Sequence, residues 1–330
     1  MNLYPLKFKP VLKERIWGGN KLTTLFNKSA SEEKIGESWE LCGFPEEDSV
    51  VSNGYLAGNT ITELIEVYMG ELVGDAVYDN YGLNFPLLFK IIDAQDKLSI
   101  QVHPDDEVAA ERHNSFGKTE MWYVLEAEEN AELIAGFNQE CTKEKYTDSL
   151  KNNSVEDLLQ KISVKKGDVI YIPAGLVHAI GKGILLAEIQ QSSDVTYRIY
   201  DYNRKDDKGN HRQLHIEEAL DVINFDSKEN PIISYEKKLN EIVELYSCDY
   251  FTTNYISFDS EVVRNYGDID SFKVYMCTEG FFNILSDGNY TPVNIGETVL
   301  IPASMSEVVF IPDGKATVLE VFAGKIDLKK

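Results

Sequence analysis

The sequence has few histidines and cysteines, little positive charge and no long apolar segment. Its 330 residues include 32 lysines and arginines against 55 aspartates and glutamates, a formal net charge of −23. This excess repels nucleic acid and anionic membranes, so neither is an expected partner. No apolar run approaches the ~20 residues that span a bilayer, and the N-terminus has no apolar signal core. We therefore expect a cytoplasmic protein.

The four cysteines, Cys42, Cys141, Cys248 and Cys277, form no C-x-x-C pair. A cytosolic chain with this spacing is expected to carry reduced structural thiols, neither disulfides nor metal ligands. The hydrophobic fraction of 43% and the charged fraction of 26% are ordinary for a globular protein.

Short runs rich in β-branched and aromatic residues, bounded by Gly, Pro, Asn or Asp, dominate the chain. Many short strands with few helices favour a β-barrel or β-sandwich fold. The strands we predict are Phe85–Ile92, Ser99–Val102, Glu120–Leu125, Asp168–Ile172, Ile184–Gln190, Lys273–Cys277, Phe281–Leu285, Thr298–Ile301 and Ala316–Phe322.

Helical periodicity is limited. The segment Thr60–Val73 predicts a helix, because Thr60 followed by Glu63 three residues later is a capping-box pattern. Shorter helices are predicted at Asp105–Arg112, Lys143–Leu150, Val155–Lys161 and Ile216–Val222. The charged segment Arg204–Arg212 is expected to be a solvated loop.

An internal repeat is visible at the level of single strands. The segment G-D-V-I-Y-I-P-A that begins at Gly167 returns 129 residues later as G-E-T-V-L-I-P-A, beginning at Gly296. Two related β-barrels are the expected result, joined by the polar segment Asp226–Glu241. Five residues after the repeated proline, the first copy has His178 and the second has Glu307.

Four residues of the first copy form a candidate metal site: Gln101, His103, Glu120 and His178. Alternation along a strand places Gln101 and His103 on one face, so both can point at one ion. Two imidazoles, a carboxylate and an amide oxygen suit zinc and leave a position for water or substrate. The second copy has no Q-x-H segment, so we expect it to be a structural barrel without metal.

These motifs resemble known families. Gly167, Pro173, Gly175 and His178 resemble the second metal motif of the cupins, although Lys182 replaces the expected Asn. The segments Q-V-H-P-D-D-E, G-K-T-E-M-W-Y and S-D-V-T-Y-R-I-Y-D-Y-N-R resemble type I mannose-6-phosphate isomerases in their compact bacterial form. Further similar segments are E-R-I-W-G-G, I-G-E-S-W-E-L, L-L-F-K-I-I-D-A and R-Q-L-H-I-E-E-A-L.

The resemblance implies two jelly-roll cupin domains. Residues 1–235 would form a catalytic zinc domain with small helical insertions, and residues 236–330 a degenerate cupin. It also implies one Zn²⁺ per chain, held by the four candidate ligands, and interconversion of mannose 6-phosphate and fructose 6-phosphate through an enediol. The expected partner is a small sugar phosphate, and the protein is expected to be a monomer or homodimer. The alternatives are a non-catalytic sugar-phosphate-binding cupin and a metal-dependent cupin oxygenase.

Candidates for the catalytic roles are Lys118, Glu188, Asp194 and Arg198. Lys118 and Glu188 are both candidates for carrying the carbon-bound proton, and the sequence does not decide between them. The resemblance favours Arg198 as catalytic with Asp194 as its supporting neighbour. The purely structural alternative for Arg198 is a salt bridge with Asp194. The structural alternative for Lys118 is an exposed position on the surface.

An anionic substrate needs local positive charge in so acidic a chain. Ser99 and Lys90 lie on segments that resemble the phosphate-contacting positions of the family, and Trp17 is expected to wall the pocket. The alternatives are a charge on an edge strand for Lys90 and barrel packing for Trp17. His113 and His215 lack ligand spacing, so we expect structural roles for both.

Overall fold

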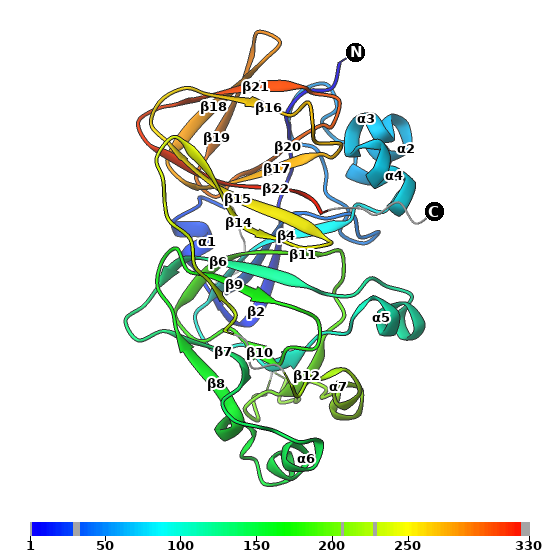
Figure 1. Ribbon diagram of the computed structural model, residues 1–330, viewed down its shortest axis with the longest axis vertical. Helices are drawn as coiled ribbons and strands as arrows, with labels where there is room; N and C mark the ends of the chain where they lie inside the picture. The colour runs from blue at the N-terminus through cyan, green and yellow to red at the C-terminus, as the bar shows by residue number, and fades with distance from the viewer. Residues whose placement is uncertain (1, 29–33, 206–207, 227–229, 325–330) are drawn as a thin grey trace.

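The computed structural model describes residues 2–28, 34–205, 208–226 and 230–324, and its regular structure is mostly antiparallel β-sheet (Figure 1). One sheet has seven strands, in the order β13 (Ile232–Ile233), β9 (Val169–Ile172), β6 (Glu120–Ala127), β11 (Ile184–Gln191), β4 (Leu87–Ala94), β2 (Val11–Gly19) and β3 (Ile35–Leu41). A five-stranded sheet has the order β12 (Tyr197–Tyr200), β5 (Ile100–Val102), β10 (His178–Ala179), β7 (Glu132–Phe137) and β8 (Leu159–Ser163).

Two further sheets come mainly from the C-terminal third of the chain. The six-stranded sheet has the order β1 (Leu6–Lys7), β20 (Thr298–Ile301), β17 (Lys273–Glu279), β22 (Ala316–Ala323), β15 (Phe251–Phe258) and β14 (Glu241–Ser247). The four-stranded sheet has the order β16 (Val262–Asn265), β21 (Glu307–Pro312), β18 (Phe281–Ser286) and β19 (Asn289–Asn294). Because β1 pairs with β20, the N-terminus crosses to the sheet built by the C-terminal residues.

The four sheets stack in layers along the long axis of the molecule, as Figure 1 shows from β18 and β19 at the top to β7 and β8 near the bottom. One core, containing Phe258 and Phe310, fills the space between the four- and six-stranded sheets. Another, containing Met121 and Val274, joins the six- and seven-stranded sheets. A third, containing Val124, lies between the seven- and five-stranded sheets. The inner strands of both central sheets, such as β4, β11 and β15, are therefore buried on two faces.

The helices are short: α1 (Lys21–Thr24), α2 (Ile61–Tyr68), α3 (Gly70–Val73), α4 (Asp75–Tyr81), α5 (Asp106–His113), α6 (Lys143–Lys151), a 3₁₀ turn η1 (Val155–Leu158) and α7 (Ile216–Val222). The capping box predicted for α2 is present. The helix predicted to continue to residue 73 ends earlier, because Met69 adopts a positive φ of 46° and separates α2 from α3. No helix in the described ranges is long and apolar enough to cross a bilayer.

One predicted helix is wrong. The segment 155–161 forms the η1 turn and then enters β8, whose Ile162 pairs opposite Leu133 of β7. The apolar residues of so short a segment fit the period of a helix and that of a strand equally well. Pairing with β7 makes its second half a strand. The predicted mainly β fold with few helices is confirmed. The predicted linker at 226–241 supplies β13, and its residues 227–229 lie outside the described residues.

The repeat occupies matching positions in the two central sheets. Ile172 precedes the proline of the first copy and pairs with Glu120 of β6, whereas Ile301 precedes the proline of the second and pairs with Lys273 of β17. Lys273 therefore stands where Glu120 stands in the first copy. In the outer sheets, His178 pairs with Gln101. Their counterparts Glu307 and Asn265 pair in the same way and are exposed.

Candidate active site

Charged side chains gather on the face of the seven-stranded sheet that looks toward the five-stranded sheet. On β11, Ala187 and Ile189 point into the core shared with the six-stranded sheet. Successive side chains of a strand alternate, so Glu188 points to the opposite face. Lys90 on β4 pairs directly opposite Glu188, and Glu120 projects from β6 on the same face. Strand register, not proximity in sequence, brings these groups together.

The predicted metal ligands converge. One possible ligand atom from each of His103, Glu120 and His178 lies within 4.8 Å of the other two, and all three side chains are buried. His178 Nε2 lies 3.4 Å from one oxygen of Glu120, and His103 Nε2 lies 3.7 Å from the other. This arrangement of two imidazoles and a carboxylate can hold a metal ion.

The two histidines have their tautomers set by the backbone. His103 Nδ1 lies 2.9 Å from the carbonyl oxygen of Val195, and His178 Nδ1 lies 2.8 Å from that of Leu176. Each Nδ1 therefore carries the proton and donates it, leaving the Nε2 lone pairs to face the cluster. Burial lowers the pKa of His178 to about 4 and that of His103 well below its ordinary value, so both rings are neutral near pH 7.

The remaining donors also suit a cation. Oε1 of Glu120 is buried without a hydrogen-bond partner, and burial together with Glu188 raises the pKa of Glu120 to about 7. A bound cation would remove this cost. Gln101 extends toward the same point, with its amide nitrogen 3.2 Å from His178 Nε2 and 3.5 Å from His103 Nε2. A half-turn of that amide would present its oxygen instead.

Lys118 reaches the same cluster and is buried, so the predicted alternative of an exposed surface lysine is wrong. Its Nζ lies 2.5 Å from Oε2 of Glu120 and 3.1 Å from Nε2 of His103. The residue precedes β6 and does not belong to it. The extended segment there, whose backbone donates to Pro104, directs the side chain inward.

Glu188 is held by donors on both carboxylate oxygens. Lys90 donates to Oε1 at 2.9 Å, and the indole of Trp122 donates to Oε2 at 2.9 Å. Lys90 also donates to Gln190 at 2.7 Å. Burial would raise the pKa of Glu188, but Lys90 and Lys118 outweigh it and lower that pKa. Lys90 sits on a central, fully covered strand, so the alternative of an edge-strand charge is wrong.

Arg198 of β12 contacts Ser99. Its Nε donates to the Ser99 hydroxyl at 3.3 Å, and Nη1 donates to the carbonyl oxygen of Gln213 at 2.9 Å. Asp194 lines the same cavity, but among the described residues the Arg198 guanidinium pairs with Ser99 and Gln213 and forms no ion pair with Asp194. Asp194 therefore does not support Arg198 by direct contact. The alternative of a purely structural salt bridge between these two residues is wrong for the same reason.

A cavity of about 840 Å³ opens beside these groups. Among the predicted site residues it is lined by Trp17, Lys90, Ser99, Gln101, Lys118, Glu188, Asp194 and Arg198. His103, Glu120 and His178 do not line the cavity themselves. They contact Gln101 and Lys118, which do. The lining carries six lysine and arginine side chains and five carboxylates, so it is slightly positive within a chain of net charge −23.

The cavity lining also includes residues that were not predicted as site residues, among them Arg15, Glu37, Arg212 and His215. His215 was expected to be structural. It lines the cavity and also positions Arg198, because its Nδ1 accepts from the Arg198 backbone N–H at 3.1 Å. All four lie within the segments E-R-I-W-G-G, I-G-E-S-W-E-L and R-Q-L-H-I-E-E-A-L. These segments were recognised as similar to the family, but their similarity alone assigned no function to the individual residues.

Comparison with known sequences identifies relatives along nearly the whole chain. Residues 5–146 match the family model of the type I phosphomannose isomerase catalytic domain. The mannose-6-phosphate isomerase ManA of Bacillus subtilis is 38% identical over 313 residues, which cover 93% of this chain and 96% of the relative. The mannose-6-phosphate isomerase of Streptococcus mutans is 44% identical over 249 residues, or 75% of this chain and 77% of the relative.

The fold agrees with these relatives. The crystal structure of the mannose 6-phosphate isomerase from Bacillus subtilis superposes with a TM-score of 0.87 at 33% identity, covering 97% of this chain and 99% of that chain. The resemblance predicted from the motifs is thus confirmed. This chain belongs to the type I mannose-6-phosphate isomerase family.

Proposed function

We propose that this protein is a zinc-dependent isomerase that interconverts D-mannose 6-phosphate and D-fructose 6-phosphate. The observation that carries the proposal is that a buried His–Glu–His cluster adjoins a cavity of about 840 Å³ whose lining includes six lysine and arginine side chains. A sugar phosphate fits such a space, because the cations can receive the phosphate while the sugar oxygens reach the cluster. Family membership supports the same substrate.

Gln101, His103, Glu120 and His178 would hold one Zn²⁺. When bound there, zinc would act as a Lewis acid toward the sugar oxygens. The support lies in the donor set: neutral imidazoles with inward lone pairs, a carboxylate oxygen without a partner and an amide that can turn.

Aldose–ketose isomerisation moves a proton between C1 and C2 of the sugar through an enediol. Both carboxylate oxygens of Glu188 already accept hydrogen bonds, which makes Glu188 a weak candidate for moving that proton. Lys118 borders the cavity, and among the described residues its amine contacts only Glu120 and His103, two of the proposed zinc ligands. We therefore assign the proton transfer to Lys118, and to Glu188 the task of fixing Lys90 and Trp122.

Arg198 would stabilise the negative charge that develops on the sugar oxygens. Ser99 and the Gln213 carbonyl fix two sides of its guanidinium, so the remaining N–H groups are pre-oriented toward the cavity. Ser99, Lys90 and Trp17 would contact the substrate, and Asp194 would act on the cavity rim near Arg198.

We further propose that the two sheet pairs are two cupin units, residues 1–235 and 236–330, with β1 crossing to the second. Their matching sheet orders and the repeat at Gly167 and Gly296 support this arrangement. Lys273 and Glu307 occupy the positions of Glu120 and His178, so the second unit would bind no metal. The protein would act in the cytoplasm as a monomer or homodimer, on small molecules and not on nucleic acid or membranes.

The test is formation of fructose 6-phosphate from mannose 6-phosphate by protein as purified, after chelation and after zinc is restored. We expect turnover to disappear on chelation and to return with zinc. Full turnover by demetallated protein would refute the zinc role. Zinc-loaded protein that binds the sugar phosphate without turning it over would refute the isomerase.

A further inference from the structure

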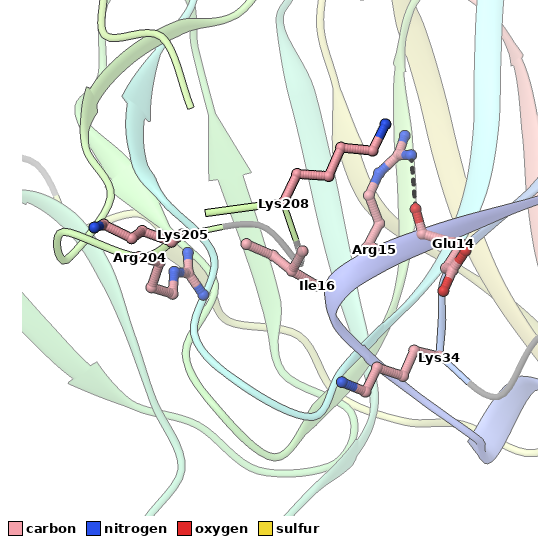
Figure 2. Close-up of a pocket in the computed structure, with 7 residues that line it drawn as sticks. All are labelled: Glu14, Arg15, Ile16, Lys34, Arg204, Lys205 and Lys208. Carbon is pink, nitrogen blue, oxygen red and sulfur yellow. Dashed lines mark hydrogen bonds between the residues drawn. The ribbon is translucent and has the colours of Figure 1, made fainter. Parts of the chain in front are cut away.

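A basic pocket of about 440 Å³ adjoins the substrate cavity, between β2 and the loop that follows β12 (Figure 2). Arg15 lines both spaces, and its guanidinium donates to the two oxygens of Glu37 at 2.9 and 3.1 Å. Across the pocket, Arg204 donates to the buried carboxylate of Asp201. These arginines are therefore compensated within the protein and call for no anionic ligand.

The loop on one side of this pocket was predicted to be solvated, and Lys205 is indeed exposed. The loop is nevertheless fixed at both ends, because Asp201, only 5% exposed, accepts hydrogen bonds from Arg204 at its start and from Arg212 at its end. Residues 206–207 lie outside the described residues.

A more direct connection to the proposed chemistry reaches the backbone on both sides of Lys118. The N–H of Gly117 donates to Oδ1 of Asp106 at 2.8 Å. The N–H of Thr119 donates to Oε1 of Gln191 at 2.9 Å, and the Gln191 amide in turn donates to Oδ1 of Asp106 at 2.9 Å. Lys118 and its two neighbours are buried, so these hydrogen bonds fix the point from which its side chain extends.

Asp106 lies in the segment Q-V-H-P-D-D-E, where no role was assigned to it. It is the first residue of α5, but the helix cap is Asp105, whose carboxylate accepts from the Val108 N–H at 3.0 Å. Helix capping therefore leaves the Asp106 side chain available to the neighbouring segment. A Cβ at Gly117 would lie 2.7 Å from backbone atoms of Asp105 and Asp106, so the two segments are in close contact. A shift of Asp106 would consequently move the segment that carries Lys118.

The second carboxylate oxygen of Asp106 is held from the six-stranded sheet. Tyr250, in the turn between β14 and β15, donates its hydroxyl to Oδ2 of Asp106 at 2.8 Å. Its ring packs against the core that joins the six- and seven-stranded sheets, and its carbonyl accepts from the Gly324 N–H at 2.9 Å. Burial and the neighbouring Asp106 raise the pKa of Tyr250, so its hydroxyl keeps its proton and acts as the donor. Tyr250 is therefore a fixed donor on a sheet that supplies none of the proposed metal ligands.

We propose that Tyr250 is a positioning residue for Lys118, acting through Asp106 and the backbone of Gly117. The proposal rests on the proposed function, in which Lys118 moves the proton between C1 and C2 of the sugar. Misplacing a reacting group by about 1 Å can lower a rate by about 100-fold, so small shifts of this segment matter. The six-stranded sheet thereby contributes to an active site whose side chains all come from elsewhere in the chain.

Tyr250→Phe tests the connection, because it removes only the hydroxyl that donates to Asp106. Tyr235→Phe is the matched control, since Tyr235 packs against the same core but donates its hydroxyl to the Gly167 carbonyl at 2.8 Å. We expect Tyr250→Phe to lower kcat about 3- to 10-fold and Tyr235→Phe to keep the wild-type kcat. Asp106→Ala removes all three hydrogen bonds to the carboxylate and should lower kcat about 10- to 100-fold.

The KM for mannose 6-phosphate and the zinc content should stay at wild-type values in Tyr250→Phe, because a positioning residue affects the proton transfer and not substrate or metal binding. Combining it with Asp106→Ala tests the route. If Tyr250 acts through Asp106, adding Tyr250→Phe to Asp106→Ala lowers kcat no further. The same 3- to 10-fold loss in the double variant would overturn the route through Asp106.

Amide hydrogen exchange at Gly117 gives a readout that does not depend on turnover. Exchange should be faster in Tyr250→Phe and Asp106→Ala than in the wild type, and unchanged in Tyr235→Phe. Unchanged exchange in Tyr250→Phe, or faster exchange with a wild-type kcat, would overturn the proposal. If the wild type does not isomerise mannose 6-phosphate, the proposed function fails, and the exchange comparison by itself accepts or rejects the support of this segment by Tyr250.

Discussion

Glu320 on β22 stands in the six-stranded sheet where Glu188 on β11 stands in the seven-stranded sheet. Glu188 accepts a hydrogen bond from the residue opposite it on each neighbouring strand. Glu320 does the same, with Tyr275 opposite on β17 and Asn254 opposite on β15. The two sheets thus share a buried carboxylate held from both sides, while the residues at the positions of the proposed metal ligands differ.

The surroundings of Glu320 differ in one respect. Arg264 of β16 reaches across from the four-stranded sheet and pairs with Glu320 at 2.5 Å, and both side chains are buried. In the first sheet pair, Glu188 instead lines the cavity of about 840 Å³. The second carboxylate is therefore neutralised within the protein, which makes it a structural group.

Glu320→Gln should destabilise the fold by about 3–5 kcal/mol, because Arg264 would be left as an unpaired buried cation. Zinc content and kcat should stay at wild-type values, since the site lies in the other sheet pair. Urea unfolding measures the first quantity, and metal analysis with the isomerase assay measures the others. Loss of zinc from this variant would contradict the separation of the two units.

Arg198→Ala should lower kcat about 10²- to 10³-fold, because a pre-oriented donor to the developing negative charge is lost. Its zinc content should remain near one per chain, since Arg198 is not among the proposed ligands. His178→Ala should lower both zinc content and kcat. His113→Ala, an exposed histidine outside the cluster, is the matched control and should leave both unchanged. Zinc loss in Arg198→Ala would show that its role is misassigned.

Lys118→Gln and Glu188→Gln separate the two candidates for proton transfer. If Lys118 carries the proton, its loss should reduce kcat about 10²- to 10⁴-fold while mannose 6-phosphate still binds. Solvent exchange of the proton at C2 should fall by the same factor. Glu188→Gln should retain more of that exchange and lose stability instead, because Lys90 would be left without its carboxylate partner. The reverse ranking of the two variants would assign the transfer to Glu188. Zinc content is measured in parallel, since Lys118 contacts Glu120.

Asp201 should make stability depend on pH in the acid range. Burial would raise the pKa of Asp201, but hydrogen bonds from Arg212 and Arg204 outweigh it and hold that pKa below its ordinary value. The carboxylate is thus favoured in the folded state, and its contribution is present above the unfolded pKa and lost as pH falls through the folded pKa. Asp201→Asn should therefore reduce the loss of unfolding free energy below pH 4, measured by urea unfolding between pH 7 and pH 3. An unchanged acid slope would exclude this contribution, and the exposed Asp313→Asn serves as control.

Much of the site was predictable because its residues lie in local patterns. Gln101 and His103 are two apart on a strand, and His178 follows a Gly–Pro turn that the repeat makes recognisable. Strand runs such as Thr298–Ile301 and the helix Ile216–Val222 were predicted with their observed bounds, since composition and period agree there. The segment 155–161 failed because its pattern fits two periods and only the pairing with β7 chose between them.

The sequence alone therefore determined the strand-rich fold, the repeat, the candidate ligands and the family, because each depends on residue type and short spacing. Tertiary structure decided which groups meet. Only strand register places Lys90 against Glu188, two residues 98 positions apart, and aligns Lys273 with the position of Glu120. Only the anchoring of one loop at Asp201 brings Arg204 and Lys205 to face Arg15. Such contacts depend on long-range pairing, which no local pattern encodes.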